Sequence, residues 1–144
     1  MTTTYDNDNI FAKILRGEAP CHNLFEDEET FVFLNIMPES KGHSLVIPKS
    51  AAADIYQIEE SYLMAMARTS KRMAAALQEA FRPDGMFVYQ LNGKVAGQTV
   101  FHIHTHLVPR YKGVPLRSHE EGMEANEVLE EQAEKIRAAL KSLQ

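Results

Sequence analysis

Three histidines alternate with apolar or β-branched residues over His102–His106, and this alternation constrains the chain more than any other feature of the sequence. Successive side chains of a β-strand point to opposite faces, so a period of two predicts a strand with one polar face. Because a strand rises about 3.3 Å per residue, the imidazoles would stand roughly 6–7 Å apart on that face. We therefore expect a row of titratable groups on one side of a sheet, with Ile103, Thr105 and Leu107 on the other side.

Imidazole side chains titrate near neutral pH, and they serve as nucleophiles or bind phosphate or metal ions. A single histidine on a strand is usually a packing or surface residue, but three in strict alternation indicate a chemical role. Three neutral imidazoles can hold zinc with an open water position if all three converge on one ion, about 2 Å from each nitrogen. Alternate residues of one strand converge only if their side chains bend inwards. A zinc site is therefore an alternative to a nucleophilic site, and the less favoured one.

The histidine run and the residues around it resemble the histidine triad family of nucleotide hydrolases and transferases. The His-x-His-x-His motif follows Gly97–Phe101, which reads GQTVF. Further segments carry the resemblance in the order of the family: Ile10–Pro20, Phe33–Pro38, Gly42–Lys49 and Asn92–Gly93. The match is nearly continuous from Asn9 to Arg110. It is closest to the bacterial branch related to purine nucleoside phosphoramidases.

The resemblance implies that His104, the middle histidine, attacks the α-phosphorus of a nucleotide and forms a transient nucleotidyl-histidine. In the family a backbone carbonyl of the same strand holds the proton on one ring nitrogen, which leaves the other nitrogen able to attack. His102 and His106 would flank the reacting phosphate, and His106 would help the leaving group to take a proton. The residues implied to contact the nucleotide or its phosphate are His43, Asn35, Asn92, Gln98 and Thr99.

Two departures from the family pattern change these expectations. Family members with a structural zinc carry Cys-x-x-Cys where this chain has Asn9 and Ala12, and a histidine where it has Ala51. We therefore expect no metal and no cofactor.

The second departure is Asn35, which stands where the family commonly has an aspartate that accepts hydrogen bonds from both ribose hydroxyls. An asparagine has only one acceptor oxygen and no charge, so we expect ribose to bind more weakly or to have one hydroxyl held differently.

The length of 144 residues and a hydrophobic content of 44% fit one compact domain. We expect a disordered tail over residues 1–9, a nucleotide-binding domain over 10–110, and a variable loop and helix over 111–144 that pack on the same domain.

The polar start does not read as a signal peptide, and no segment reaches the roughly 20 apolar residues of a membrane span. With one cysteine, the chain is expected in the cytoplasm. A net charge of −5 argues against a nucleic-acid partner.

Hydrophobic spacing predicts an α+β fold with a five-stranded antiparallel sheet and helices on one face. The expected helices cover residues 10–16, 59–81 and 124–143. The expected strands cover residues 22–26, 30–36, 44–47 and 86–91 and the histidine run. The family joins two copies by their sheet edges and long helices, so the resemblance also predicts a homodimer.

Together these features predict an enzyme that releases a nucleoside monophosphate, with a purine nucleotide as substrate, from a phosphoramidate, an anhydride or a similar leaving group. A nucleotide-binding regulatory protein with little turnover is one alternative, and Asn35 favours it. A dinucleoside polyphosphate hydrolase is another, although that branch of the family fits the sequence less well. A metalloprotein that uses the histidines as a zinc site is the third, and it would lose function when treated with a chelator.

Overall fold

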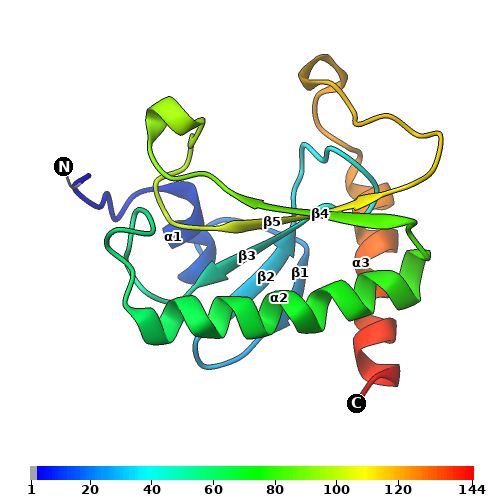
Figure 1. Ribbon diagram of the computed structural model, residues 1–144, viewed down its shortest axis with the longest axis horizontal. Coiled ribbons are helices and arrows are strands. Elements are labelled where there is room, and N and C mark those ends of the chain that lie inside the picture. The colour runs from blue at the N-terminus through cyan, green and yellow to red at the C-terminus, as the bar shows by residue number, and fades with distance from the viewer. Residues whose placement is uncertain (1–2) are drawn as a thin grey trace.

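A five-stranded antiparallel sheet forms the centre of the protein (Figure 1). The structure is a computed structural model, and it describes residues 3–144 except for the side chain of His119. The strand order is β1-β2-β3-β5-β4, so β5 lies inside the sheet and β4 forms one of its edges. The strands are β1 (Asn23–Glu26), β2 (Thr30–Leu34), β3 (Ser44–Pro48), β4 (Gly85–Gln90) and β5 (Thr105–Arg110).

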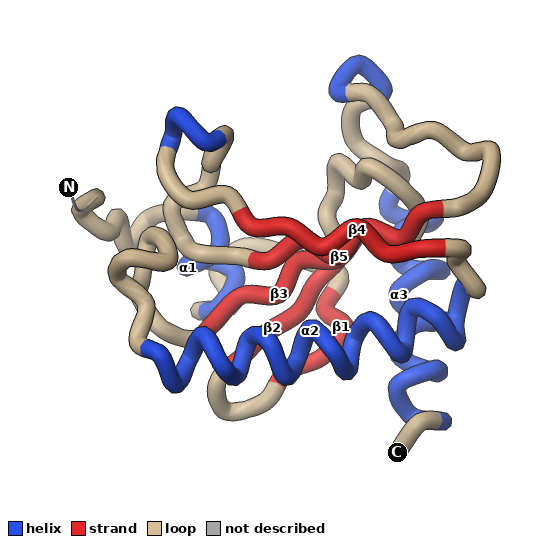
Figure 2. Tube along the Cα trace, in the orientation of Figure 1, coloured by secondary structure: helices blue, strands red, loops and turns tan. Residues whose placement is uncertain are grey.

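Two long helices, α2 (Glu60–Phe81) and α3 (Asn126–Ser142), cover one face of the sheet. Figure 2 shows α2 lying along the sheet and α3 crossing it near the C-terminal end of α2. Alternate residues of β2 and β3, such as Val32 and Val46, pack on this side in the larger hydrophobic core. No helix in the described residues combines the length and the apolar character needed to cross a membrane.

The short helix α1 (Ile10–Leu15) packs on the opposite face of the sheet. Its buried side chains Phe11 and Ile14 form a second hydrophobic core with the other alternate residues of β2 and β3. These residues include Phe33 and Leu45. His106 pairs with Leu45 in the register of β5 and β3, so its side chain points to this second face. The histidines therefore lie on the side of the sheet that α2 and α3 leave open.

The predicted α+β fold and its five-stranded antiparallel sheet are confirmed, and the predicted boundaries of helices and strands lie within about two residues of those observed. The helix α1 differs from the expectation because it lies on the other face from the two long helices. The histidine run also differs, since β5 begins only at Thr105. The peptide N–H of Ile103 donates to the carbonyl of Ala52 at 2.9 Å, so this part of the run leaves the sheet and contacts the segment after β3.

Residues 3–9 belong to the segment for which the sequence predicts a disordered tail, and in the structure they make polar contacts with other parts of the chain. The side-chain amide of Gln57 donates to the carbonyl of Thr3, and the hydroxyl of Tyr5 bonds to His102 at 2.7 Å. Asn9 caps α1, because its side-chain oxygen accepts from the peptide N–H of Ala12 at 2.9 Å. The contacts of Thr3 and Tyr5 reach far along the chain, and local hydrophobic spacing gives no sign of them. Residues 1 and 2 of the predicted tail lie outside the described residues.

Candidate active site

His104 has one ring nitrogen held by the backbone and the other without a hydrogen-bond partner among the described residues. Its Nδ1 lies 2.7 Å from the carbonyl oxygen of His102. A carbonyl only accepts, so Nδ1 carries the proton and the Nε2 of the neutral ring has a lone pair. The ring packs edge to face on Phe11, with ring centroids 4.9 Å apart. This fixed tautomer leaves Nε2 with the lone pair that the predicted nucleophile needs, and the carbonyl belongs to the same segment as the one that the family resemblance implies.

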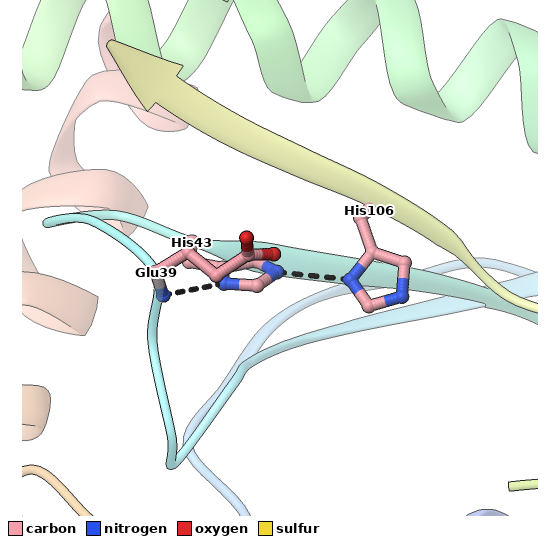
Figure 3. Close-up of side chains that lie close together, drawn as sticks. All are labelled: Glu39, His43 and His106. Carbon is pink, nitrogen blue, oxygen red and sulfur yellow. Dashed lines mark hydrogen bonds between the residues drawn. The ribbon is translucent and has the colours of Figure 1, made fainter. Parts of the chain in front are cut away.

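A chain of hydrogen bonds fixes the tautomers of His43 and His106 (Figure 3). The peptide N–H of Glu39 donates to Nδ1 of His43 at 2.9 Å. The proton of neutral His43 therefore sits on Nε2, which donates to Nδ1 of His106 at 3.0 Å. By the same argument, neutral His106 carries its own proton on Nε2. The ring centroids of His104 and His106 lie 4.9 Å apart, closer than regular strand spacing predicts.

Both ring nitrogens of His102 are already engaged. Its Nε2 donates to the carbonyl of Pro48 at 2.8 Å, and its Nδ1 accepts from the hydroxyl of Tyr5 at 2.7 Å. The resemblance implies a phosphate contact for His102, but neither nitrogen can make one in this arrangement. The two bonds instead fix the residue whose backbone carbonyl orients His104.

Burial keeps this histidine cluster neutral. It lowers the pKa of His43 and of His102 to about 4 and the pKa of His106 to about 3. The pKa of His104 is also lowered from its ordinary value, and burial is again the largest cause. The four rings are therefore uncharged at neutral pH. His104 consequently keeps the lone pair that an attack on phosphorus requires.

The predicted carboxamide residues hold loops in place. Oδ1 of Asn35 accepts from the peptide N–H of Met37 at 2.8 Å, in the loop after β2. Oδ1 of Asn92 accepts from the peptide N–H of Ile55 at 2.7 Å, and its amide donates to Gln90 at 2.9 Å. The resemblance implies that Asn35 binds ribose. In the structure its single acceptor oxygen already accepts a hydrogen bond from within the chain.

Gln98 and Thr99 lie at the end of the loop that leads into the histidine run. Gln98 is buried; its amide donates to the carbonyls of Ala53 and Val100, and its oxygen accepts from the peptide N–H of Gly93 at 2.7 Å. Its side chain therefore braces the loop from within. Thr99 is exposed and has no side-chain hydrogen bond to the described residues. Among Asn92, Gln98 and Thr99, only Thr99 has a side chain without a hydrogen bond to the described residues.

Tyr89, Glu39 and Tyr5 also contact the histidine cluster, although no sequence pattern marked them as site residues. Tyr89 stacks on His106 with ring centroids 4.1 Å apart and ring planes 7° apart, and its hydroxyl donates to the carboxylate of Glu39. Tyr5 bonds to His102. The pairing of Tyr89 with His106 depends on the register of β4 and β5, which a long connecting loop separates in the sequence. No signal in the sequence marks the contact of Tyr5.

Glu39, His43 and His106 are the one group of potential metal ligands whose donor atoms converge among the described residues, all within 4.8 Å of one another. Their hydrogen bonds do not suit a metal ion. Because Nδ1 of His43 accepts from the peptide of Glu39, a metal bound at Nε2 would have to displace the only ring proton of a neutral imidazole. The zinc alternative for the triad meets a similar obstacle, since both nitrogens of His102 and Nδ1 of His104 are engaged. The donor set therefore favours a hydrogen-bond relay over a metal site.

A cavity of about 480 Å³ lies beside Glu39, between the loop before β3 and the segment that follows β5. It contains two cationic and two acidic side chains, so it favours no single charge on a bound group. The charged residues that line it are Glu39, Lys41, Arg117 and Glu124.

The chain is similar in sequence to known proteins. Residues 16–113 match the model of the HIT domain. The chain is 38% identical over 107 residues to the adenosine 5'-monophosphoramidase HNT1 of Saccharomyces cerevisiae, covering 74% of this chain and 65% of that protein. It is also 38% identical over 109 residues to the adenylylsulfatase HINT3 of Arabidopsis thaliana, covering 76% of this chain but only 55% of the longer plant protein.

The fold is likewise similar to that of a solved structure. The crystal structure of a Hit-like protein from Bartonella henselae matches with a TM-score of 0.88 and 40% sequence identity. The match covers 94% of this chain and 99% of that chain. The matched domain, the relatives and the shared fold confirm the family predicted from the histidine run. The chain belongs to the histidine triad (HIT) family.

Proposed function

We propose that this protein is a nucleotide hydrolase that releases a purine nucleoside monophosphate from a nitrogen or oxygen leaving group, through a nucleotidyl intermediate on His104. The observation that carries the proposal is the lone pair on Nε2 of His104 in a buried, neutral histidine cluster. The two relatives described above are named for different leaving groups, an amine and a sulfate, on an adenylyl group. This difference supports a reaction centred on the phosphorus atom.

In the first step Nε2 of His104 attacks the α-phosphorus. A phosphorus–nitrogen bond forms, the bond to the leaving group breaks, and its electron pair departs with the leaving atom. The ring of His104 becomes cationic, and the carbonyl of His102 stabilises the Nδ1–H of that cation. The Nε2–H of His106 donates a hydrogen bond to a phosphate oxygen or to the leaving atom, which takes its proton from water.

In the second step water attacks the same phosphorus atom. The bond between phosphorus and His104 breaks, the nucleoside monophosphate leaves, and the neutral ring is restored. No metal takes part in either step of this proposal. Dividing one displacement into two lets the same histidine serve substrates with different leaving groups, a dinucleoside polyphosphate included.

A nucleotide-binding regulatory protein with little turnover is the second candidate function, and one observation favours it. The oxygen of Asn35 accepts a hydrogen bond from Met37 within the chain, so it is a weaker partner for ribose than the aspartate common in the family. A protein with this function would bind the nucleotide, but its His104 ring would form no covalent bond with the phosphorus atom.

We also propose a homodimer joined through the edge strand β4. The other edge strand, β1, is covered by α3, whereas β4 has no strand beyond it in the described residues. Phe87 and Val88 of β4 are 43% and 53% exposed, and Met64 of α2 is 56% exposed. An uncovered edge strand with apolar side chains favours pairing with another chain.

Replacing the nucleophile tests the proposed hydrolysis. His104→Ala should lower kcat/KM for adenosine 5'-phosphoramidate by about 1,000-fold or more, because no other group replaces the attacking nitrogen. His22→Ala is the matched control, since His22 lies outside the cluster and bonds to Glu130 and Asn126. Steady-state release of AMP measures both variants. Full activity in His104→Ala would contradict the mechanism, and AMP binding without turnover in the wild type would favour the regulatory function.

The pH dependence of kcat/KM tests the protonation state of His104. Attack requires the neutral ring, and burial lowers the pKa of His104 from its ordinary value near 6.5. Activity should therefore persist as the pH falls through 6.5 and be lost only at lower pH, when the ring gains a proton. Rates measured between pH 4 and 8, with circular dichroism to confirm the fold at each pH, locate the midpoint. A midpoint at or above about 6.5 would be inconsistent with a buried neutral nucleophile.

Light scattering during gel filtration tests the dimer. The wild type should elute with twice the 16.3 kDa mass of the chain. Val88→Asp should give the monomer mass at micromolar concentration, because it places a charge on the edge strand. Val95→Asp is the matched control, since Val95 is fully exposed in the loop before the histidine run. A wild type at the monomer mass, or a Val88→Asp variant that stays dimeric, would exclude this interface.

A further inference from the structure

We propose that Tyr89 is a positioning residue that keeps His106 in its Nε2–H form. Tyr89 does so by contacting both ends of the relay that runs from Glu39 through His43 to His106. The inference rests on the proposed function only for its kinetic readout, because the proton position on His106 can be measured without turnover.

The first contact fixes the plane of the His106 ring. Tyr89 and His106 are paired residues on the neighbouring strands β4 and β5, so their side chains leave the sheet on the same face. The rings stack with centroids 4.1 Å apart and planes 7° apart. A flip of the imidazole about its χ2 angle must pass through an orientation perpendicular to the tyrosine ring. The stack opposes that rotation and so keeps Nδ1 directed at His43.

The second contact fixes Glu39, which lies in the loop between β2 and β3. The hydroxyl of Tyr89 donates to the carboxylate of Glu39, while the peptide N–H of Arg117 donates to the carbonyl of Glu39 at 2.8 Å. Burial and the nearby carboxylate raise the pKa of Tyr89, so the hydroxyl keeps its proton and stays a donor. The peptide N–H of Glu39 is thereby held on Nδ1 of His43.

This hydrogen bond sets the direction of the whole relay. If the peptide of Glu39 moved away, His43 could carry its proton on Nδ1 and would then accept at Nε2. His106 would have to donate from Nδ1, and its own Nε2 would lose its proton. A lone pair would then face the phosphate oxygens in place of a donor. The tyrosine hydroxyl, which touches neither of these nitrogens, therefore determines whether His106 can stabilise the reacting phosphate.

The test compares two tyrosine variants that each remove one hydroxyl bonded to the loop between β2 and β3. Tyr89→Phe keeps the stacked ring and loses the bond to Glu39. Tyr111→Phe is the matched control, because the Tyr111 hydroxyl donates to the carbonyl of Lys41 in the same loop at 2.9 Å and has no contact with the relay. Two-bond 1H–15N spectra report which ring nitrogen of His43 and of His106 carries the proton. Steady-state kinetics report kcat and KM separately.

We expect the wild type and Tyr111→Phe to show the Nε2–H form of both rings. Tyr89→Phe should show a substantial Nδ1–H population on His106 and a loss of about tenfold in kcat, with a smaller change in KM. Tyr89→Phe with wild-type ring spectra would overturn the inference, whatever its kcat. If the wild type shows no turnover with any adenylyl substrate, the proposed function fails while the spectra still decide the role of Tyr89.

Discussion

The arrangement of the histidine cluster depends on the hydrogen bond between Nδ1 of His104 and the carbonyl of His102. Without a fixed acceptor on one nitrogen, a neutral imidazole exchanges between two tautomers, and the nitrogen that faces the substrate has a lone pair for only part of the time. The carbonyl can serve as this acceptor because the His102 ring is itself held at both nitrogens, by Pro48 and by Tyr5. The proposed nucleophile is therefore positioned by the backbone of its own motif.

Burial and hydrogen bonding act together in the rest of the cluster. Burial favours neutral imidazoles, and each neutral ring can donate at one nitrogen and accept at the other. The contacts of His43 and His106 use these donors and acceptors in one direction, starting at the peptide N–H of Glu39. The relay ends at the Nε2–H of His106, which has no hydrogen-bond partner among the described residues. The sheet provides the rigid support, since β3, β4 and β5 bring His43, Tyr89 and His106 together.

Much of the fold follows from local sequence patterns, but the contacts of the site do not. Hydrophobic spacing predicts the long helix and the strands because each buries one stripe or face. His102 bonds to Pro48 and Ile103 bonds to Ala52, so the first part of the histidine run is not part of β5. These contacts join segments about 50 residues apart in the sequence. The stack of Tyr89 on His106 depends on strand register, which alternation along one strand cannot fix. Likewise, the sequence shows that Asn35 is an asparagine but not that its oxygen is already bonded within the chain.

Direct observation of the covalent intermediate tests the central claim. The enzyme, in excess over adenosine 5'-phosphoramidate, would be quenched in alkali at successive times, and intact-mass and peptide measurements would locate any adduct. The account predicts one adenylyl group on His104 that accumulates before AMP appears and decays as AMP is released. Formation of AMP at the full rate with no adduct, or an adduct on another residue, would contradict His104 as the nucleophile.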